Sequence, residues 1–146
     1  MSEGLYSREI LRLAVSIPHQ ERLTNPDASA ELRSRTCGSR AVIDVIISKD
    51  GRLKQLGIEI NACALGQASA AILGAEAIGK KASEVSEARR HLAGYLAGNG
   101  ASSGDWKNIN MLDVAKDHKG RHAAILLPFE TLIVAFDKAL AKRKAA

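Results

Sequence analysis

The chain has 146 residues, the length of a single domain, and its 46% hydrophobic and 25% charged residues are typical of a globular protein. Only 3% of the residues are aromatic, which argues against single-stranded nucleic-acid binding by base stacking. The formal charge of +5 is spread along the chain without a helix-turn-helix pattern. This positive charge predicts either a solvated surface or a docking face for an acidic protein or a nucleic acid. The lack of a helix-turn-helix pattern argues against DNA. We expect one domain over residues 1–146.

No signal-peptide pattern opens the sequence, and no apolar stretch approaches the roughly 18 residues that a membrane span needs. The two cysteines, Cys37 and Cys63, do not form a Cys-x-x-Cys pair, and a domain of this size needs no disulfide for stability. We therefore expect a cytoplasmic protein with both thiols reduced.

The first half of the chain predicts one helix and three strands. Apolar residues at helical spacing indicate a helix over residues 4–16, which stops before Pro18. Alternating apolar residues predict strands over residues 29–36, 40–48 and 53–61, the last two joined by a hairpin turn. Asp44, a lone carboxylate within the second strand, is expected to face solvent rather than to act as a catalytic acid. Three strands joined by short turns predict an antiparallel meander.

The second half of the chain is expected to be helical. Apolar spacing predicts helices over residues 66–78 and 83–97. Residues 122–142 are expected to form one or two helices, with Pro128 at the start of the final one. Strands followed by helices indicate an α+β fold in which the helices cover one face of the sheet.

Each cysteine is expected where a strand ends. Cys37 follows the first strand and precedes Gly38, whose lack of a side chain permits a tight turn and the close approach of a ligand. Cys63 stands between the third strand and the next helix, where the positive end of the helix dipole favours the thiolate, the form that binds metal. In a three-stranded meander the two positions can meet at one edge of the sheet. The alternative is that both thiols are small buried apolar groups.

Three segments resemble the ligand segments of the NifU/IscU/SufU family of iron–sulfur cluster assembly scaffolds. Arg35-Thr36-Cys37-Gly38 is similar to the turn that carries the family's first cysteine. The stretch 61–70 resembles the second segment, a cysteine followed by a helix of small residues, and the stretch 121–129 resembles the third. The resemblance covers essentially the whole chain.

The resemblance implies a SufE/NifU-like domain, in which helices pack on one face of a three-stranded antiparallel meander. It also implies a scaffold or carrier rather than an enzyme. Such proteins accept sulfur from a cysteine desulfurase and assemble an iron–sulfur cluster, or bind iron or zinc, at three cysteines and an aspartate. They then pass the cluster to recipient apo-proteins.

Carried over residue by residue, the resemblance gives Cys37 and Cys63 as the ligands of a cluster or metal. Ser39 stands where the family has its aspartate, and Ala124 stands where it has its third cysteine. These departures matter because two thiolates alone do not close a four-coordinate iron or zinc site.

Three ways to complete the site stay open. His122 or His118 could supply an imidazole, with His122 the nearer to the vacant position. A homodimer could bring together four thiolates, a set suited to a [2Fe–2S] cluster. Alternatively, the protein holds no cluster and docks on a cysteine desulfurase or a scaffold as a regulator, or accepts sulfur as a persulfide.

Overall fold

The computed structural model describes residues 6–35 and 38–145, so Thr36 and Cys37 lie outside the described residues. The elements in chain order are α1 (Arg8–Ala14), β1 (Ala28–Arg33), β2 (Arg40–Ile47), β3 (Leu53–Asn61), α2 (Ala64–Glu76), α3 (Ala82–Leu96), the 3₁₀ helices η1 (Ile109–Ala115) and η2 (Lys119–Arg121), and α4 (His122–Ala145). None of the described helices is both long and apolar enough to cross a membrane.

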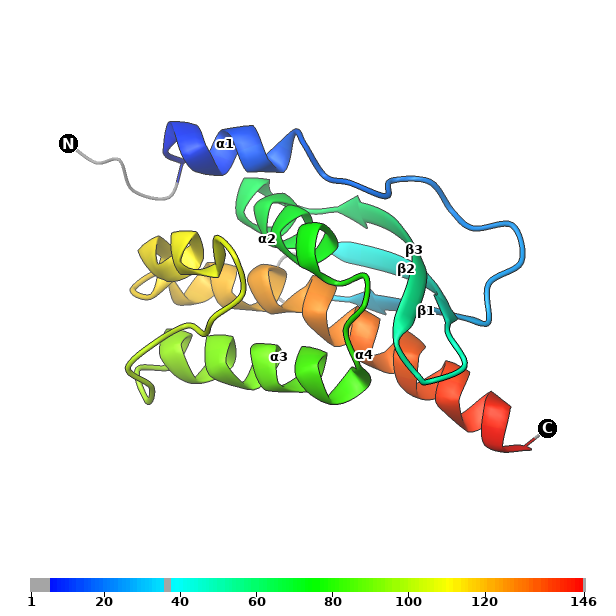
Figure 1. The fold of residues 1–146 in the computed structure, drawn as a ribbon. Helices are drawn as coiled ribbons and strands as arrows, with labels where there is room; N and C mark the ends of the chain where they lie inside the picture. The colour runs from blue at the N-terminus through cyan, green and yellow to red at the C-terminus, as the bar shows by residue number, and fades with distance from the viewer. Residues whose placement is uncertain (1–5, 36–37, 146) are drawn as a thin grey trace.

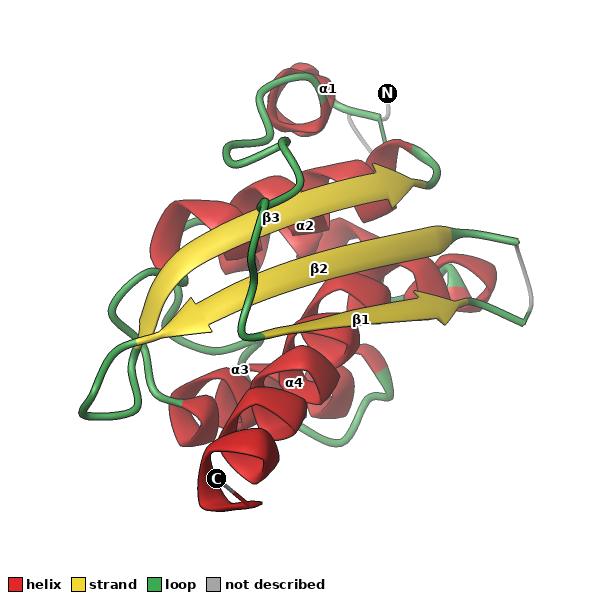
Figure 2. Ribbon diagram, turned by 90° about the vertical axis from the view of Figure 1, so that its right-hand side faces the viewer, coloured by secondary structure: helices red, strands yellow, loops and turns green. Residues whose placement is uncertain are grey.

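The three strands form one antiparallel sheet in the order β1-β2-β3, as the alternating sequence predicts. The turn between β2 and β3 contains Gly51. Its φ of 82° is a backbone conformation that glycine adopts with little strain. Helices α2, α3 and α4 lie on one face of the sheet (Figure 1), and Figure 2 shows the opposite face with the strands in front of the helices. The predicted α+β fold with helices on one face is therefore confirmed.

A single core, mostly aliphatic but including Phe129 and Phe136, joins the sheet to these helices. Helix α2 is buried on nearly all sides because it contacts β3, α1 and α4 at once. Its small residues allow this: a Cβ added to Gly74 would lie 2.8 Å from the ring of Pro18. Close packing of small residues in α2 therefore adds to the contribution of the large buried side chains, which include Phe129 and Phe136.

Residues 18–27, in the connection between α1 and β1, cross the outer face of the sheet, and we call them the strap (Figure 2). The carbonyl of His19 accepts a hydrogen bond from the Ile58 amide of β3 at 2.7 Å. Further along, the strap lies so close to β3 that a Cβ on Gly57 would come within 2.6 Å of the Glu21 carbonyl oxygen. A glycine in the strand therefore permits the strap to lie directly on the sheet.

Asp44 anchors the strap, and the expectation that it faces solvent is wrong. Its side chain is fully buried and accepts hydrogen bonds from Arg22 Nε at 2.7 Å and from the second guanidinium nitrogen at 3.0 Å. The Leu23 amide and the Ser29 hydroxyl donate to the same carboxylate. Burial acts to raise the pKa of Asp44, but these donors outweigh it and hold the pKa below its usual value.

Helix α4 is one continuous helix, so the prediction that Pro128 starts the final helix is wrong. A proline inside a helix removes the hydrogen bond to the carbonyl four residues earlier. One turn before Pro128, the Ser69 hydroxyl of α2 donates to the Ile125 carbonyl at 2.5 Å. Helix α2 therefore packs against α4 and donates a hydrogen bond to it in the turn where Pro128 lacks a main-chain N–H.

Candidate functional site

The sheet register brings the two predicted ligand segments to one end of the sheet. Arg40, the first residue of β2, pairs with Asn61, the last residue of β3. Ser39 immediately precedes Arg40, and Cys63 follows Asn61 by two residues. Cys37 lies outside the described residues, but Gly38 and Ser39 place the end of its segment beside that of Cys63. The described parts of both segments lie at the same end of the sheet, and the convergence of the two cysteines themselves stays a prediction.

Cys63 is the N-cap residue of α2 and carries a free thiol. Its backbone is extended, with φ −66° and ψ 171°, and its carbonyl accepts the Gln67 amide at 2.9 Å. The side chain makes no capping hydrogen bond and is half-buried. Cys63 packs against the edge of the hydrophobic core and is partly exposed at the start of the helix, so a ligand could reach it.

Ser39 is less open than Cys63, with only 4% of its surface exposed. Its carbonyl accepts the Ser34 amide at 2.8 Å and so extends the pairing of β1 and β2 beyond the strands. The residue that stands in the family's aspartate position therefore lies within the wall of the site.

The start of α4 lies against the start of α2. A Cβ on Gly66 would lie 3.2 Å from the Ala124 carbonyl oxygen and 3.4 Å from the Ala124 Cβ. Ala124 is fully buried in this contact, whereas its neighbour Ala123 is half-buried. Ala124, which the resemblance assigns to the position of the third cysteine, thus lies in the first turn of α4 against the first turn of α2, which begins after Cys63. Ala123 is the more open of the two positions.

The two candidate histidines differ in their surroundings. The Nε2 atom of His122 lies 2.8 Å from the Ala115 carbonyl oxygen, and a carbonyl can only accept, so Nε2 carries the proton. Its Nδ1 atom then holds the lone pair that a metal needs. His118 is exposed at the start of η2. Within the described ranges, no three His, Cys, Asp or Glu side chains are close enough to hold a metal ion together.

Charged side chains on the outer face of the sheet neutralise one another beside this end. Arg40 donates to Glu31 of β1 at 2.7 Å and to Glu59 of β3 at 2.9 Å. The Arg40 hydrogen bond is the main reason why the pKa of Glu31 is lowered, and its charge adds to that effect. This bridge fixes the three strands next to the cysteine segments.

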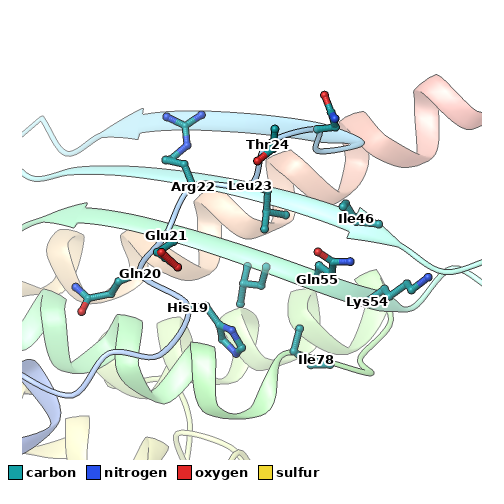
Figure 3. A pocket seen from close by; sticks show the side chains of 12 residues that line it. His19, Gln20, Glu21, Arg22, Leu23, Thr24, Ile46, Lys54, Gln55 and Ile78 are labelled. Carbon is teal, nitrogen blue, oxygen red and sulfur yellow. The ribbon is translucent and has the colours of Figure 1, made fainter.

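A large open cavity lies at the other end of β3. It is an open groove of about 750 Å³ between the strap and the sheet, and it includes His19, Lys54 and Ile78 (Figure 3). Lys54 stands at the start of β3 and Cys63 follows its end, so the groove is separate from the cysteine site.

The chain was compared with known proteins, and no protein-family model matches it. It is 25% identical over 134 residues to the iron–sulfur cluster assembly scaffold protein IscU of Thermotoga maritima, covering 92% of this chain and 94% of that protein.

Two solved structures resemble the fold closely. The N-terminal part of a nitrogen-fixing NifU-like protein from Brucella abortus matches with a TM-score of 0.88 and 29% identity, over 95% of this chain and 96% of that one. A putative iron–sulfur cluster assembly scaffold protein for the SUF system from Fervidobacterium islandicum matches with a TM-score of 0.84 and 21% identity, over 93% and 99%.

A three-stranded meander with a cysteine at the start of a small-residue helix defines an α+β domain of the scaffold type. In sequence and in fold the chain is similar to the NifU/IscU/SufU scaffold proteins of iron–sulfur cluster assembly, as its sequence predicts. It departs from the family pattern in having Ser39 in place of the aspartate and no third cysteine.

Proposed function

We propose that this protein is a non-enzymatic scaffold or carrier in iron–sulfur cluster assembly. Its cargo is iron or an iron–sulfur cluster of the [2Fe–2S] type, with zinc as the alternative, held by the thiolates of Cys37 and Cys63. The carrying observation is that Cys63 caps α2 at the sheet end where β2 begins, within a fold that matches a NifU-like domain over 95% of the chain.

The donor set limits how tightly cargo is held. Two thiolates fill half of a four-coordinate site, so the remaining positions need other ligands. His122 is the better-placed histidine, because the Ala115 carbonyl fixes its tautomer and leaves Nδ1 free to bind. An incompletely closed site favours transfer over storage, which fits a carrier.

The expected partners follow from this role. A cysteine desulfurase supplies sulfur, and recipient apo-proteins take the cluster. Both reactions need reduced thiols, which the cytoplasm maintains.

The alternative function is a cluster-less family member that docks on a desulfurase or scaffold as a regulator or a sulfur acceptor. The observation that favours it is that Ser39 and Ala124 stand where the family has its aspartate and its third cysteine. A regulator needs neither thiol, whereas a sulfur acceptor needs one.

Two measurements test these functions against each other: the bound iron and zinc, and the binding to a purified cysteine desulfurase. Both are made on the wild-type protein and on variants that lack a cysteine. The proposal expects Cys37→Ser and Cys63→Ser each to abolish bound iron and zinc, with desulfurase binding retained. His122→Gln is expected to weaken metal binding without abolishing it. A wild-type protein that binds the desulfurase but never retains metal would favour the regulator.

A further inference from the structure

The outer edge of β1 is an incompletely covered strand edge. In the sheet order β1-β2-β3, β1 pairs with β2 on one side only. The Ser34 amide donates to Ser39 directly opposite, so even-numbered residues of β1 direct their main-chain groups toward β2. The odd-numbered residues, among them Glu31 and Arg33, therefore direct their amides and carbonyls outward.

Helix α4 covers the beginning of this edge and leaves the rest uncovered. Lys142 donates to the Asp27 carbonyl and Lys138 to the Ser29 carbonyl, both at 3.4 Å. Figure 2 shows the C-terminal half of α4 below the start of β1, with the remainder of the helix behind the sheet. Among the described residues, no group pairs with the outward main chain of Glu31 or Arg33. Uncovered edges of this kind accept a further strand.

The side chains along the uncovered edge are complementary to a second copy of themselves. If two β1 strands pair antiparallel about a two-fold axis at Leu32, Glu31 of each copy faces Arg33 of the other. Both side chains have free surface, since 45% of Glu31 and 67% of Arg33 is exposed. A register with its axis at Glu31 would instead oppose two carboxylates, which is unfavourable.

The monomer also carries a like-charge contact that this pairing relieves. Arg33 lies directly opposite Arg40 in the sheet, and its only ion pair with a described residue is a long contact of 3.6 Å to Glu31. Glu31 is shared, because it also accepts from Arg40. Glu31 of a second copy would give Arg33 a second carboxylate, across the interface.

We propose that this protein self-associates through the β1 edge, forming a continuous six-stranded sheet with its two-fold axis at Leu32. The pairing is confined to Glu31 and Arg33, which allows about four main-chain hydrogen bonds and two cross-strand ion pairs. The dimer is therefore weak and reversible. Antiparallel strands end at opposite sides, so each copy keeps its own Cys63, and the dimer forms whether or not metal binds.

Sedimentation velocity of the metal-free protein over about a hundredfold range of concentration tests the proposal by mass action. Wild type is expected to shift from monomer to dimer, and Arg33→Glu to weaken dimerisation by about tenfold or more. Arg90→Glu is the matched control, because Arg90 is 69% exposed and has one comparable ion pair at 3.5 Å on α3. A monomer throughout the range, or equal effects of the two variants, overturns the proposal.

Cross-linking tests the register independently of these charges. Facing residues of a pair without mutual hydrogen bonds have Cα atoms about 4.5 Å apart, within reach of a disulfide. In a Cys37→Ser, Cys63→Ser background, Leu32→Cys is expected to form a covalent dimer on mild oxidation. Arg35→Cys, three residues from the axis, is expected to stay monomeric. Equal cross-linking of the two, or none at Leu32→Cys, contradicts the two-fold arrangement.

Discussion

Gly66 and Ala124 lie against each other where α2 and α4 begin, one helical turn beyond Cys63. The absence of a side chain at Gly66 lets the two helices approach closely, and the helix starts that frame the site depend on that approach. A Cβ at Gly66 would lie 2.7 Å from the Ala62 Cβ, closer than atoms of these types pack.

Gly66→Ala is therefore expected to destabilise the protein although alanine is the better helix former. We expect a loss of about 1–3 kcal/mol in the free energy of unfolding, because Ala62 must move away from the new Cβ and α4 must also give slightly. Gly94→Ala is the matched control: it changes a glycine inside α3 that has open space around its Cβ position. It is expected to stabilise by about 0.5–1 kcal/mol. Urea unfolding measures both, and equal effects would contradict the close approach.

A third cysteine is expected to increase metal retention only at a position in the first turn of α4 that is partly exposed. Ala123→Cys places a thiol at the half-buried position in the first turn of α4 and is expected to increase zinc retention during dialysis. Ala124→Cys places it in the buried contact with Gly66 and is expected to leave retention unchanged and lower stability. If Ala124→Cys retained more zinc than Ala123→Cys, this account of the helix start would be wrong.

Removal of the Asp44 carboxylate is expected to loosen the strap. Asp44→Ala leaves the Leu23 amide and the Arg22 guanidinium without their buried acceptor. We expect a loss of about 2 kcal/mol of stability, with faster hydrogen exchange in the strap. Asp105→Ala, at an exposed position, serves as the control and is expected to change stability by less than about 0.5 kcal/mol.

Because of the Asp44 carboxylate, the stability of the protein is expected to depend on pH in the acid range. The pKa of this carboxylate is lower in the folded protein than the usual value of about 3.9, so the unfolded chain takes up the proton first as the pH falls. The stabilisation is complete above pH 3.9 and is lost as the pH falls through the folded pKa. Asp44→Asn has no such titration, so its stability relative to wild type should rise in this acid range. A constant difference from pH 7 to pH 2 would rule out this role for the Asp44 charge.

The strands were the most predictable part of the fold. Residues 53–61 alternate cleanly between apolar and polar side chains, and β3 occupies that range. The first helix is shorter than expected, since periodicity over residues 4–16 does not locate its N-cap, Ser7. The helix at Pro128 was predicted incorrectly because its support comes from Ser69 on another helix.

The candidate site was predictable to the level of segments but not of individual side chains. The alternating pattern of residues 53–61 placed Cys63 at a strand end, and the sheet register brings that end to Ser39. Neighbouring alanines look alike in a sequence, so only packing separates buried Ala124 from half-buried Ala123. Asp44 was misjudged because its partner Arg22 is 22 residues away in a segment without periodicity.

Anaerobic reconstitution with iron and sulfide tests the central claim most directly. We would measure iron, sulfide and zinc content together with the visible absorption spectrum, on wild type, Cys37→Ser and Cys63→Ser. The account predicts that wild type gains a cluster absorption band, or retains zinc, and that each variant loses it. Wild-type protein that holds neither cluster nor metal, or a Cys63→Ser variant that holds as much as wild type, would contradict it.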